Sequence, residues 1–234
     1  MALGSGIFNS KSPEKPHLVR GSGGLAGEIN DIRQDIKAEF QYSPIIVVEE
    51  LTNPAAAGVE LISAVAQSQV AAGRSATLLA LAAAISPPRN ITVSTGAGGT
   101  PADAPATAVV TGTDINGDAL TETLNISQTA ATVAGLKAFA SVSSIVEAAG
   151  EGTGAAISYG IGVLIGLGKK AATRAGAPAI VKEIAAGVLV PTAGVFAAAA
   201  TGLPNGTYSP NSAADGSRDY TLYYELDMTE LTDA

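Results

Sequence analysis

The chain has 234 residues, with no cysteine, no tryptophan and one histidine, and its 21 acidic and 13 basic residues give a formal net charge of −8. These counts exclude disulfides, thiolate metal sites and cysteine nucleophiles, and they argue against a dedicated nucleic-acid binder, which needs a basic surface. Charged residues make up only 15% of the chain, against about 25% in an average soluble domain. Because small residues dominate the rest, the composition favours a structural or interaction protein over an enzyme.

The amino-terminal region divides into an arm and a helix. Residues 1–24 are rich in Gly, Ser, Pro and basic side chains without an apolar period, so we expect an extended arm. In residues 25–43, apolar residues recur at three- and four-residue spacing with charged residues between them, which predicts an amphipathic helix over Leu25–Gln41. Pro44 follows its end, because the residue before a proline leaves the helical region. The apolar stripe is a candidate interface and consists of Ile29, Ile32, Ile36 and Phe40.

Residues 44–234 are predicted to form a mainly β body, with a division into two subdomains near residue 86 as an option. Short runs with alternating or β-branched residues, separated by Gly and Pro, favour a β-sandwich or a barrel-like body. The predicted strands are Ile45–Val48, Asn90–Thr95, Ala138–Val146, Ala155–Ile165, Ala179–Lys182, Thr207–Ser209 and Asp219–Leu226.

Two alanine-rich stretches, Val59–Ile85 and Ile184–Ala200, are apolar enough to be tested as membrane spans. Polar residues interrupt the first, whose start alternates like a strand and whose middle would also tolerate a helix. The second is shorter than the roughly 20 residues of a spanning helix and contains glycine and proline. We therefore expect no membrane contact and interpret both stretches as core segments.

The clearest local signal is a β-hairpin formed by Ala106–Asp114 and Ala119–Ser127. Asn116-Gly117 between them is the preferred pair for a two-residue type I′ turn. Such a turn pairs Val109 with Leu124, and it places Leu120, Leu124 and Ile126 on the buried face of the second strand.

The hairpin tip also has the spacing that opens a calcium-binding loop, with Asp114, Asn116 and Asp118. That loop needs glycine at its sixth position and glutamate at its twelfth, whereas this chain has Ala119 and Asn125 there. We therefore interpret the three residues as a turn and predict no metal site.

A glycine-rich run, Gly160–Lys170, has some features of a phosphate-binding loop. It lacks glycine at the position that a dinucleotide fingerprint requires, and Lys170 stands where a P-loop requires Ser or Thr. We expect these glycines to permit close packing or bulges in a strand that ends at a basic turn, and we predict no cofactor.

The remaining chemistry-bearing residues do not combine into a catalytic set. His17 is the only histidine and lies in the predicted arm, away from a partner that could hold its ring. Two carboxylate pairs are available, Glu49-Glu50 at a strand end and Glu225 with Asp227 on one solvated strand face. Neither pair is associated with a predicted cleft, so we predict no catalytic residue.

Three of the six tyrosines, Tyr220, Tyr223 and Tyr224, fall in one predicted strand. Tyrosine is enriched at interfaces because it buries a large area and keeps a polar tip. An interface strand and a core strand with tyrosines at its margins are both consistent with this pattern.

Three segments resemble structural proteins of tailed bacteriophages: PRNITVST at Pro88–Thr95, VVTGTDINGDALTET at Val109–Thr123, and the carboxy-terminal Asn205–Asp227 with its N-G-x-Y-x-P and G-x-R-D-Y patterns. Within that group the chain is most similar to capsid decoration (cement) proteins, which fasten neighbouring capsomers. The resemblance implies a β-rich virion component on the capsid exterior, without catalytic residues.

The partner implied by the resemblance is the major capsid protein, and a homo-oligomer is expected, with a trimer as one option. Two other functions stay open. One is another virion role, as a tail tube, head–tail adaptor or fibre-associated protein. The other is a carbohydrate-binding β-sandwich, which would need an exposed aromatic platform or a carboxylate pair across a cleft.

Overall fold

The computed structural model describes residues 45–66, 85–96, 100–150, 152, 154–174, 177–178, 180–197 and 204–227. Residues 46–234 belong to one compact unit. The predicted arm and amphipathic helix lie outside the described residues. The strands in chain order are β1 (Ile46–Leu51), β2 (Gly58–Ala66), β3 (Arg89–Thr95), β4 (Thr107–Thr113), β5 (Ala119–Asn125), β6 (Thr132–Phe139), β7 (Ser141–Glu147), β8 (Ala156–Gly166), β9 (Thr173–Arg174), β10 (Ala177–Pro178), β11 (Ile180–Ala185), β12 (Val188–Leu189), β13 (Val195–Ala197), β14 (Thr207–Ser209) and β15 (Tyr220–Glu225), with one 3-10 turn at Pro101–Asp103.

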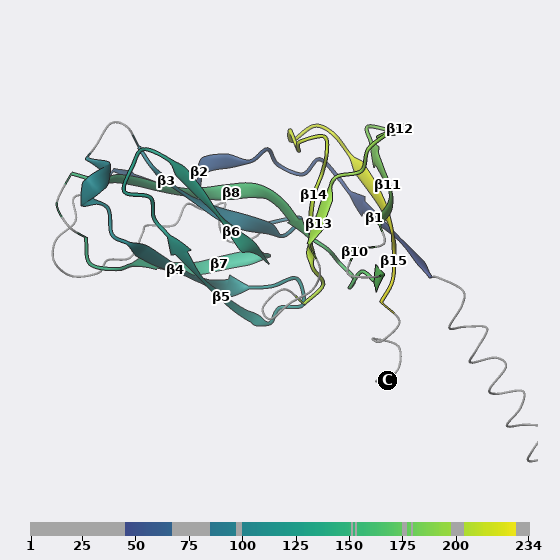
Figure 1. The fold of residues 1–234 in the computed structure, drawn as a ribbon, viewed down its shortest axis with the longest axis horizontal. Coiled ribbons are helices and arrows are strands. Elements are labelled where there is room, and N and C mark those ends of the chain that lie inside the picture. The colour runs from purple at the N-terminus through teal and green to yellow at the C-terminus, as the bar shows by residue number, and fades with distance from the viewer. Residues whose placement is uncertain are drawn as a thin grey trace, which may run out of the picture. The chain divides into compact units, whose positions relative to one another are not determined.

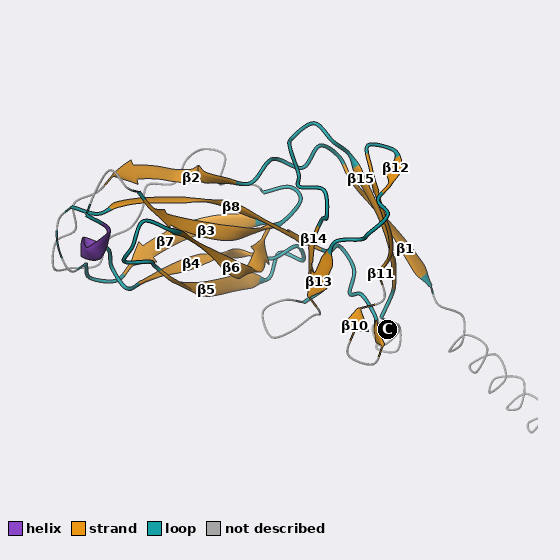
Figure 2. Ribbon diagram, turned by 45° about the horizontal axis from the view of Figure 1, so that its top comes forward, coloured by secondary structure: helices purple, strands orange, loops and turns teal. Residues whose placement is uncertain are grey.

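The strands form three larger sheets and one two-stranded ribbon, β10-β9 (Figures 1 and 2). The largest sheet has the order β13-β14-β8-β3-β6, and β2 also pairs with β8. The second sheet is β1-β15-β11-β12 and the third is β5-β4-β7. All of the pairings in these sheets are antiparallel. The prediction of a mainly β, sandwich-like or barrel-like body is therefore confirmed.

One hydrophobic core lies between the sheet of β2, β8, β3 and β6 and the three-stranded sheet β5-β4-β7 (Figure 2). Ile91 and Val93 of β3 and Ile157 and Ile161 of β8 meet the inner face of the smaller sheet. That inner face consists of Ala108, Val110, Leu120, Leu124, Val142 and Ile145. Alternation along β4 and β5 provides it, because successive side chains of a strand point to opposite faces.

The prediction of a single strand over Ala138–Val146 is wrong. The chain leaves the large sheet at Phe139, where β6 ends, and enters the small sheet at Ser141, where β7 begins. Between them, Ala140 donates its N–H to Thr113 O (2.8 Å) and accepts from Ile85 N (2.7 Å). The segment has neither Gly nor Pro at the corner, so a local pattern cannot reveal the change of sheet.

The predicted hairpin is present as β4–β5, but its turn type and register differ by one residue from the prediction. Ala108, not Val109, pairs with Leu124, and Asp114 and Asp118 enclose a three-residue loop. Gly117 donates to Asp114 O (3.1 Å) and has φ +86°, whereas Asn116 has no positive φ. This is a type I turn followed by a glycine bulge, the usual form of three-residue hairpin loops. The buried face of β5 is as predicted, while Val109 points outward.

The side chain of Asp114 explains why the longer turn forms. Its Oδ1 accepts the backbone N–H groups of Asn116 (2.8 Å) and Asp118 (3.0 Å). An aspartate at this position mimics a backbone turn and stabilises the type I geometry over the type I′ geometry. The acidic residues at the hairpin tip therefore serve the turn.

A second core cluster lies beneath the sheet β1-β15-β11-β12 and includes Leu51, Ile165, Leu167, Tyr208, Tyr220, Leu222 and Tyr224. Residues on both sides of residue 86 share the first core, among them Ile62 and Ile91, and Leu51 belongs to the second. The cores therefore do not divide at residue 86.

The prediction of a core segment over Ile184–Ala200 is wrong for much of its described part. A turn at Ala186-Gly187 follows β11, and Val188, Leu189 and Val195 are 68%, 54% and 74% exposed. Of Val59–Ile85, the described start is strand β2, and residues 67–84 lie outside the described part.

Strands β3 and β8 meet at a junction that uses two buried polar side chains, Arg89 and Asn90. Arg89 donates to Ala55 O (2.7 Å) and to Gly162 O, and Asn90 donates to Gly135 O (2.8 Å) while accepting from Leu164 N (2.9 Å). The amide of Asn90 occupies the space where a Cβ at position 162 would lie. Bulges in both strand pairs expose the backbone groups that these side chains bind.

The hairpin geometry predicts unequal effects of substitutions at its tip. Gly117→Ala should lower the free energy of unfolding by about 1 kcal/mol, because a Cβ is unfavourable at positive φ. Asn116→Ala should change it by less than about 0.5 kcal/mol, as for an ordinary surface site. Urea unfolding measures both values. Equal losses at the two positions would indicate a type I′ turn instead.

Candidate functional site

The residues predicted as an interface fall into two groups, those outside the described residues and those in β15. Ile29, Ile32, Ile36 and Phe40 lie outside the described residues, so their role stays a prediction. In β15, side chains alternate: Tyr220 and Tyr224 are buried in the second core, and Tyr223 is half-buried on the opposite face. Tyr220 and Tyr224 are therefore core residues, as one of the two alternatives predicted. Tyr223 lies on a face where it can contact a partner.

Buried tyrosines of this chain are paired with glutamates. The hydroxyl groups of Tyr208, Tyr224 and Tyr159 donate to carboxylates at 2.5, 2.7 and 2.9 Å respectively. Their acceptors are Glu183, Glu49 and Glu147. A buried charge is tolerated only when hydrogen bonds replace its hydration, and the phenol supplies one such bond in each pair.

Glu183 of β11 is the most highly connected of these carboxylates. It is fully buried and accepts Tyr208 OH together with the backbone N–H groups of Gly194 (3.1 Å), Asn211 (3.0 Å) and Ser212 (3.3 Å). Gly194 N also donates to Tyr208 OH (2.6 Å). Burial, and then the bond to Glu183, raises the pKa of Tyr208. One carboxylate thus fixes two loops to the sheet.

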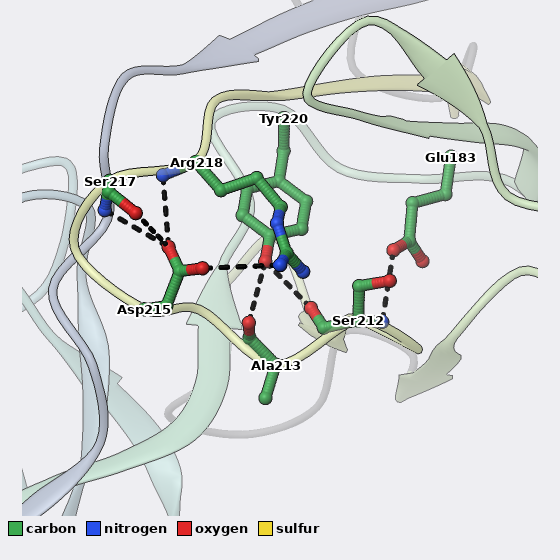
Figure 3. Close-up of polar contacts among 7 residues, drawn as sticks. All are labelled: Glu183, Ser212, Ala213, Asp215, Ser217, Arg218 and Tyr220. Carbon is green, nitrogen blue, oxygen red and sulfur yellow. Dashed lines mark hydrogen bonds and ion pairs between the residues drawn. The ribbon is translucent and has the colours of Figure 1, made fainter.

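Tyr220 anchors the loop that leads into β15 (Figure 3). Its hydroxyl donates to the carbonyl oxygens of Ser212 (2.7 Å) and Ala213 (2.9 Å). In the same loop Asp215 accepts the N–H groups of Ser217 (3.0 Å) and Arg218 (2.9 Å) and forms an ion pair with the Arg218 guanidinium (3.2 Å). The hydrogen bond from Ser217 N is the main reason that the pKa of Asp215 is lowered.

The carboxylate pairs that the sequence offered do not act as pairs. Glu49 and Glu50 point to opposite faces of β1: Glu49 accepts Tyr224 OH and Gly168 N (3.1 Å), and Glu50 is exposed. Glu225 and Asp227 are half-buried, and Asp227 forms an ion pair with Lys170 (3.0 Å). The bonds of Glu49 and Asp227 hold loops and strand ends in place.

The glycine run behaves as the sequence predicts. Gly160, Gly162 and Gly166 lie inside β8, which ends immediately before the basic turn. A Cβ at Gly166 would lie 2.7 Å from Ala138 Cβ, so the glycine allows the end of β6 to approach β8 closely. Within the described part of the chain, no group of three or more acidic or histidine side chains is placed to hold a metal ion.

Arg89 is the polar residue that sequence reasoning missed. Its guanidinium is 1% exposed, and no described carboxylate forms an ion pair with it. Burial lowers the pKa of Arg89 from its ordinary value to about 10, and nearby Tyr220 opposes the shift. The Pro-Arg-Asn strand start was visible in the sequence, but no local pattern indicates that its two polar side chains are buried.

The outer face of β5-β4-β7 is a candidate interface of a different kind. None of the side chains that these strands direct to it is charged, although the chain as a whole carries a net charge of −8. Val109 and Val146 lie directly opposite each other at its centre and are exposed. We call this surface the neutral face; its other members are Thr107, Thr111, Thr113, Ala119, Thr121, Thr123, Asn125, Ser141 and Ser144.

No protein-family model, curated protein or solved structure matches the chain. Among the described residues there is no helix with the length and apolar character needed to cross a membrane.

The Glu183 cluster predicts a measurable loss of stability. Glu183→Gln should lower the free energy of unfolding by about 2–3 kcal/mol, because the amide brings an N–H₂ group to a site where four donors converge. Glu50→Gln, in the same sheet but exposed, is the matched control and should change it by less than about 0.5 kcal/mol. Chemical denaturation measures both. Similar values for the two variants would show that the Glu183 carboxylate does not hold the loops.

Proposed function

We propose that this protein is a non-enzymatic structural component of a tailed-phage virion, and specifically a head decoration protein that binds the capsid exterior and fastens neighbouring capsomers. The neutral face is the observation that carries the proposal. An uncharged β surface on an acidic protein provides a contact area that needs no charged partner and no reactive group.

The internal polar groups support the same proposal. Glu183, Glu49 and Asp215 use their oxygens on backbone N–H groups and tyrosine hydroxyls of the chain itself. Such bonds stiffen loops at the surface, and a rigid surface binds with a smaller loss of conformational entropy. Binding to a lattice multiplies many weak contacts, so one modest face for each copy is sufficient.

The carbohydrate-binding alternative has less support from the described tyrosines. Tyr159, Tyr208, Tyr220 and Tyr224 are buried, and only Tyr223 among the described tyrosines is partly exposed. A sugar platform normally presents an aromatic ring to solvent. The other virion roles differ from decoration in the assembly that the protein forms.

The proposal predicts saturable binding to undecorated phage capsids, with density at repeated lattice positions in images of the particles. Thr121→Lys combined with Thr123→Lys should weaken this binding at least tenfold, because two lysines would have to be desolvated at the contact. The control is Thr52→Lys, which places a single added lysine on an exposed loop.

Two results would contradict the decoration proposal. One is the absence of binding to capsids while the protein alone forms rings or tubes, which would assign it to the tail. The other is capsid binding that the neutral-face lysines and the Thr52→Lys control affect equally, which would exclude the neutral face as the contact.

A further inference from the structure

The tip of the β4–β5 hairpin holds an Asn-Gly pair, Asn116-Gly117, that is exposed to solvent. The backbone nitrogen that follows an asparagine can attack the carbon of the side-chain amide. Glycine leaves that nitrogen the least hindered, because it has no Cβ. A Cβ built at Gly117 would have no heavy atom within 4 Å, so the space around the pair is open. Both reacting groups are therefore accessible to water.

We infer that Asn116 is a site of spontaneous deamidation. Gly117 N attacks Asn116 Cγ and forms a C–N bond, the Cγ–Nδ2 bond breaks, and the amide nitrogen leaves as ammonia with the proton of Gly117 N. One water molecule then opens the succinimide ring and returns a proton to Gly117 N. Cleavage of the new bond gives aspartate, whereas cleavage between Gly117 N and the backbone carbon of residue 116 gives isoaspartate.

The bonds that restrain this pair are few and lie at the surface. Gly117 N donates to Asp114 O at 3.1 Å, which is near the long end of the usual range. Within the described part of the chain, no hydrogen bond holds the side-chain amide of Asn116. Residues 115–119 are exposed, so this loop can open locally while both cores stay intact.

The chain has a second Asn-Gly pair, Asn205-Gly206, which the fold protects. Both glycines have φ +86°, so their backbone conformation does not distinguish the two pairs. Asn205 is 7% exposed, and its Nδ2, which would be the leaving group, donates to Leu167 O (3.0 Å). Leu167 N donates in turn to Gly206 O (3.2 Å), and Leu167 belongs to the second core. Reaction at Asn205 therefore requires that core to open.

Exposure of an asparagine is not sufficient by itself. Asn125 and Asn211 are also exposed, but the nitrogen that follows each of them is bound. Ile126 N donates to a backbone carbonyl at 2.9 Å, and Ser212 N donates to a buried carboxylate at 3.3 Å. Both of these following residues also carry a Cβ. Among the described asparagines, Asn116 alone is exposed and precedes an exposed glycine.

The reaction would change the hairpin tip in two ways. Each product adds one negative charge close to Asp114 and Asp118, in a chain whose net charge is already −8. Isoaspartate also lengthens the backbone by one carbon, so Gly117 N loses its register with Asp114 O. The loop between β4 and β5 is therefore altered, while the cores behind it keep their contacts.

Peptide mapping by mass spectrometry of the purified full chain, aged in mildly alkaline buffer, tests the inference. In the folded protein, Asn116 should convert to aspartate and isoaspartate at least tenfold faster than Asn205, because opening an exposed loop costs much less free energy than opening a core. In the chain unfolded by guanidinium, the two pairs should react at similar rates, since the same dipeptide is then exposed at both positions. Ageing in heavy-oxygen water should place one solvent oxygen in each product.

Two variants separate the chemistry from general effects on folding. Gly117→Ala should slow conversion of Asn116 at least tenfold, because its Cβ hinders the attacking nitrogen. The same substitution weakens the turn, and a weaker turn would by itself speed the reaction. Ile115→Ala is the matched control, since it changes an exposed residue of the same loop and keeps the Asn-Gly pair. It should leave the conversion rate within about twofold of wild type, as expected for a surface substitution.

Three results would overturn the inference. The first is equal conversion of Asn116 and Asn205 in the folded chain. The second is an Asn116 that reacts in the unfolded chain and not in the folded one. The third is conversion of Asn116 that Gly117→Ala does not slow. None of these measurements involves capsids, so the proposed function is judged separately by its own binding experiment.

Discussion

The described fold depends on the pairing of β3 with β8, because β8 contributes to both hydrophobic cores. Ile157, Tyr159 and Ile161 of β8 belong to the first core, whereas Ile165 belongs to the second. Between these groups the strand bulges at Gly162, and the side chains of Arg89 and Asn90 bind the backbone groups that the bulge leaves unpaired. An unpaired buried backbone group costs about 1–3 kcal/mol, so these two side chains make the shared strand stable.

The need to pair buried polar groups also explains how the chain uses its charged residues. Charged residues are only 15% of the sequence. Four of them have charged groups that the chain itself wholly or partly buries: Glu183, Glu49, Glu147 and Arg89. Their partners are backbone groups and tyrosine hydroxyls. The outer face of β5-β4-β7 carries no charged side chain. We propose that the protein acts through this neutral face, toward a capsid.

The sequence predicted the elements that local pattern controls. Alternation located β3, β8 and β15, and Asn116-Gly117 located the hairpin. The Asn-Gly pair did not predict the turn type. The preference of this pair for a type I′ turn takes no account of the hydrogen bonds that the Asp114 side chain adds. The sequence pattern did not predict the change of sheet at Ala140 either, since no residue there breaks a strand.

The candidate interfaces were predictable only in part, for a related reason. Tyr223 was identified among three tyrosines, but separating it from Tyr220 and Tyr224 requires knowing which face of β15 is buried. Val48 becomes a neighbour of Tyr223 only through the long-range pairing of β1 with β15. Buried Arg89 was missed because an arginine before a strand is normally exposed.

Hydrogen–deuterium exchange of the Gly162→Ala variant tests most directly whether the β3–β8 junction supports both cores. A Cβ at position 162 would displace the Asn90 amide. We predict that, in increasing urea, peptides from β4 and β5 and peptides from β11 and β15 lose protection together, at a lower concentration than in the wild-type protein. Loss of protection in one set only, or an unchanged urea dependence, would contradict the account.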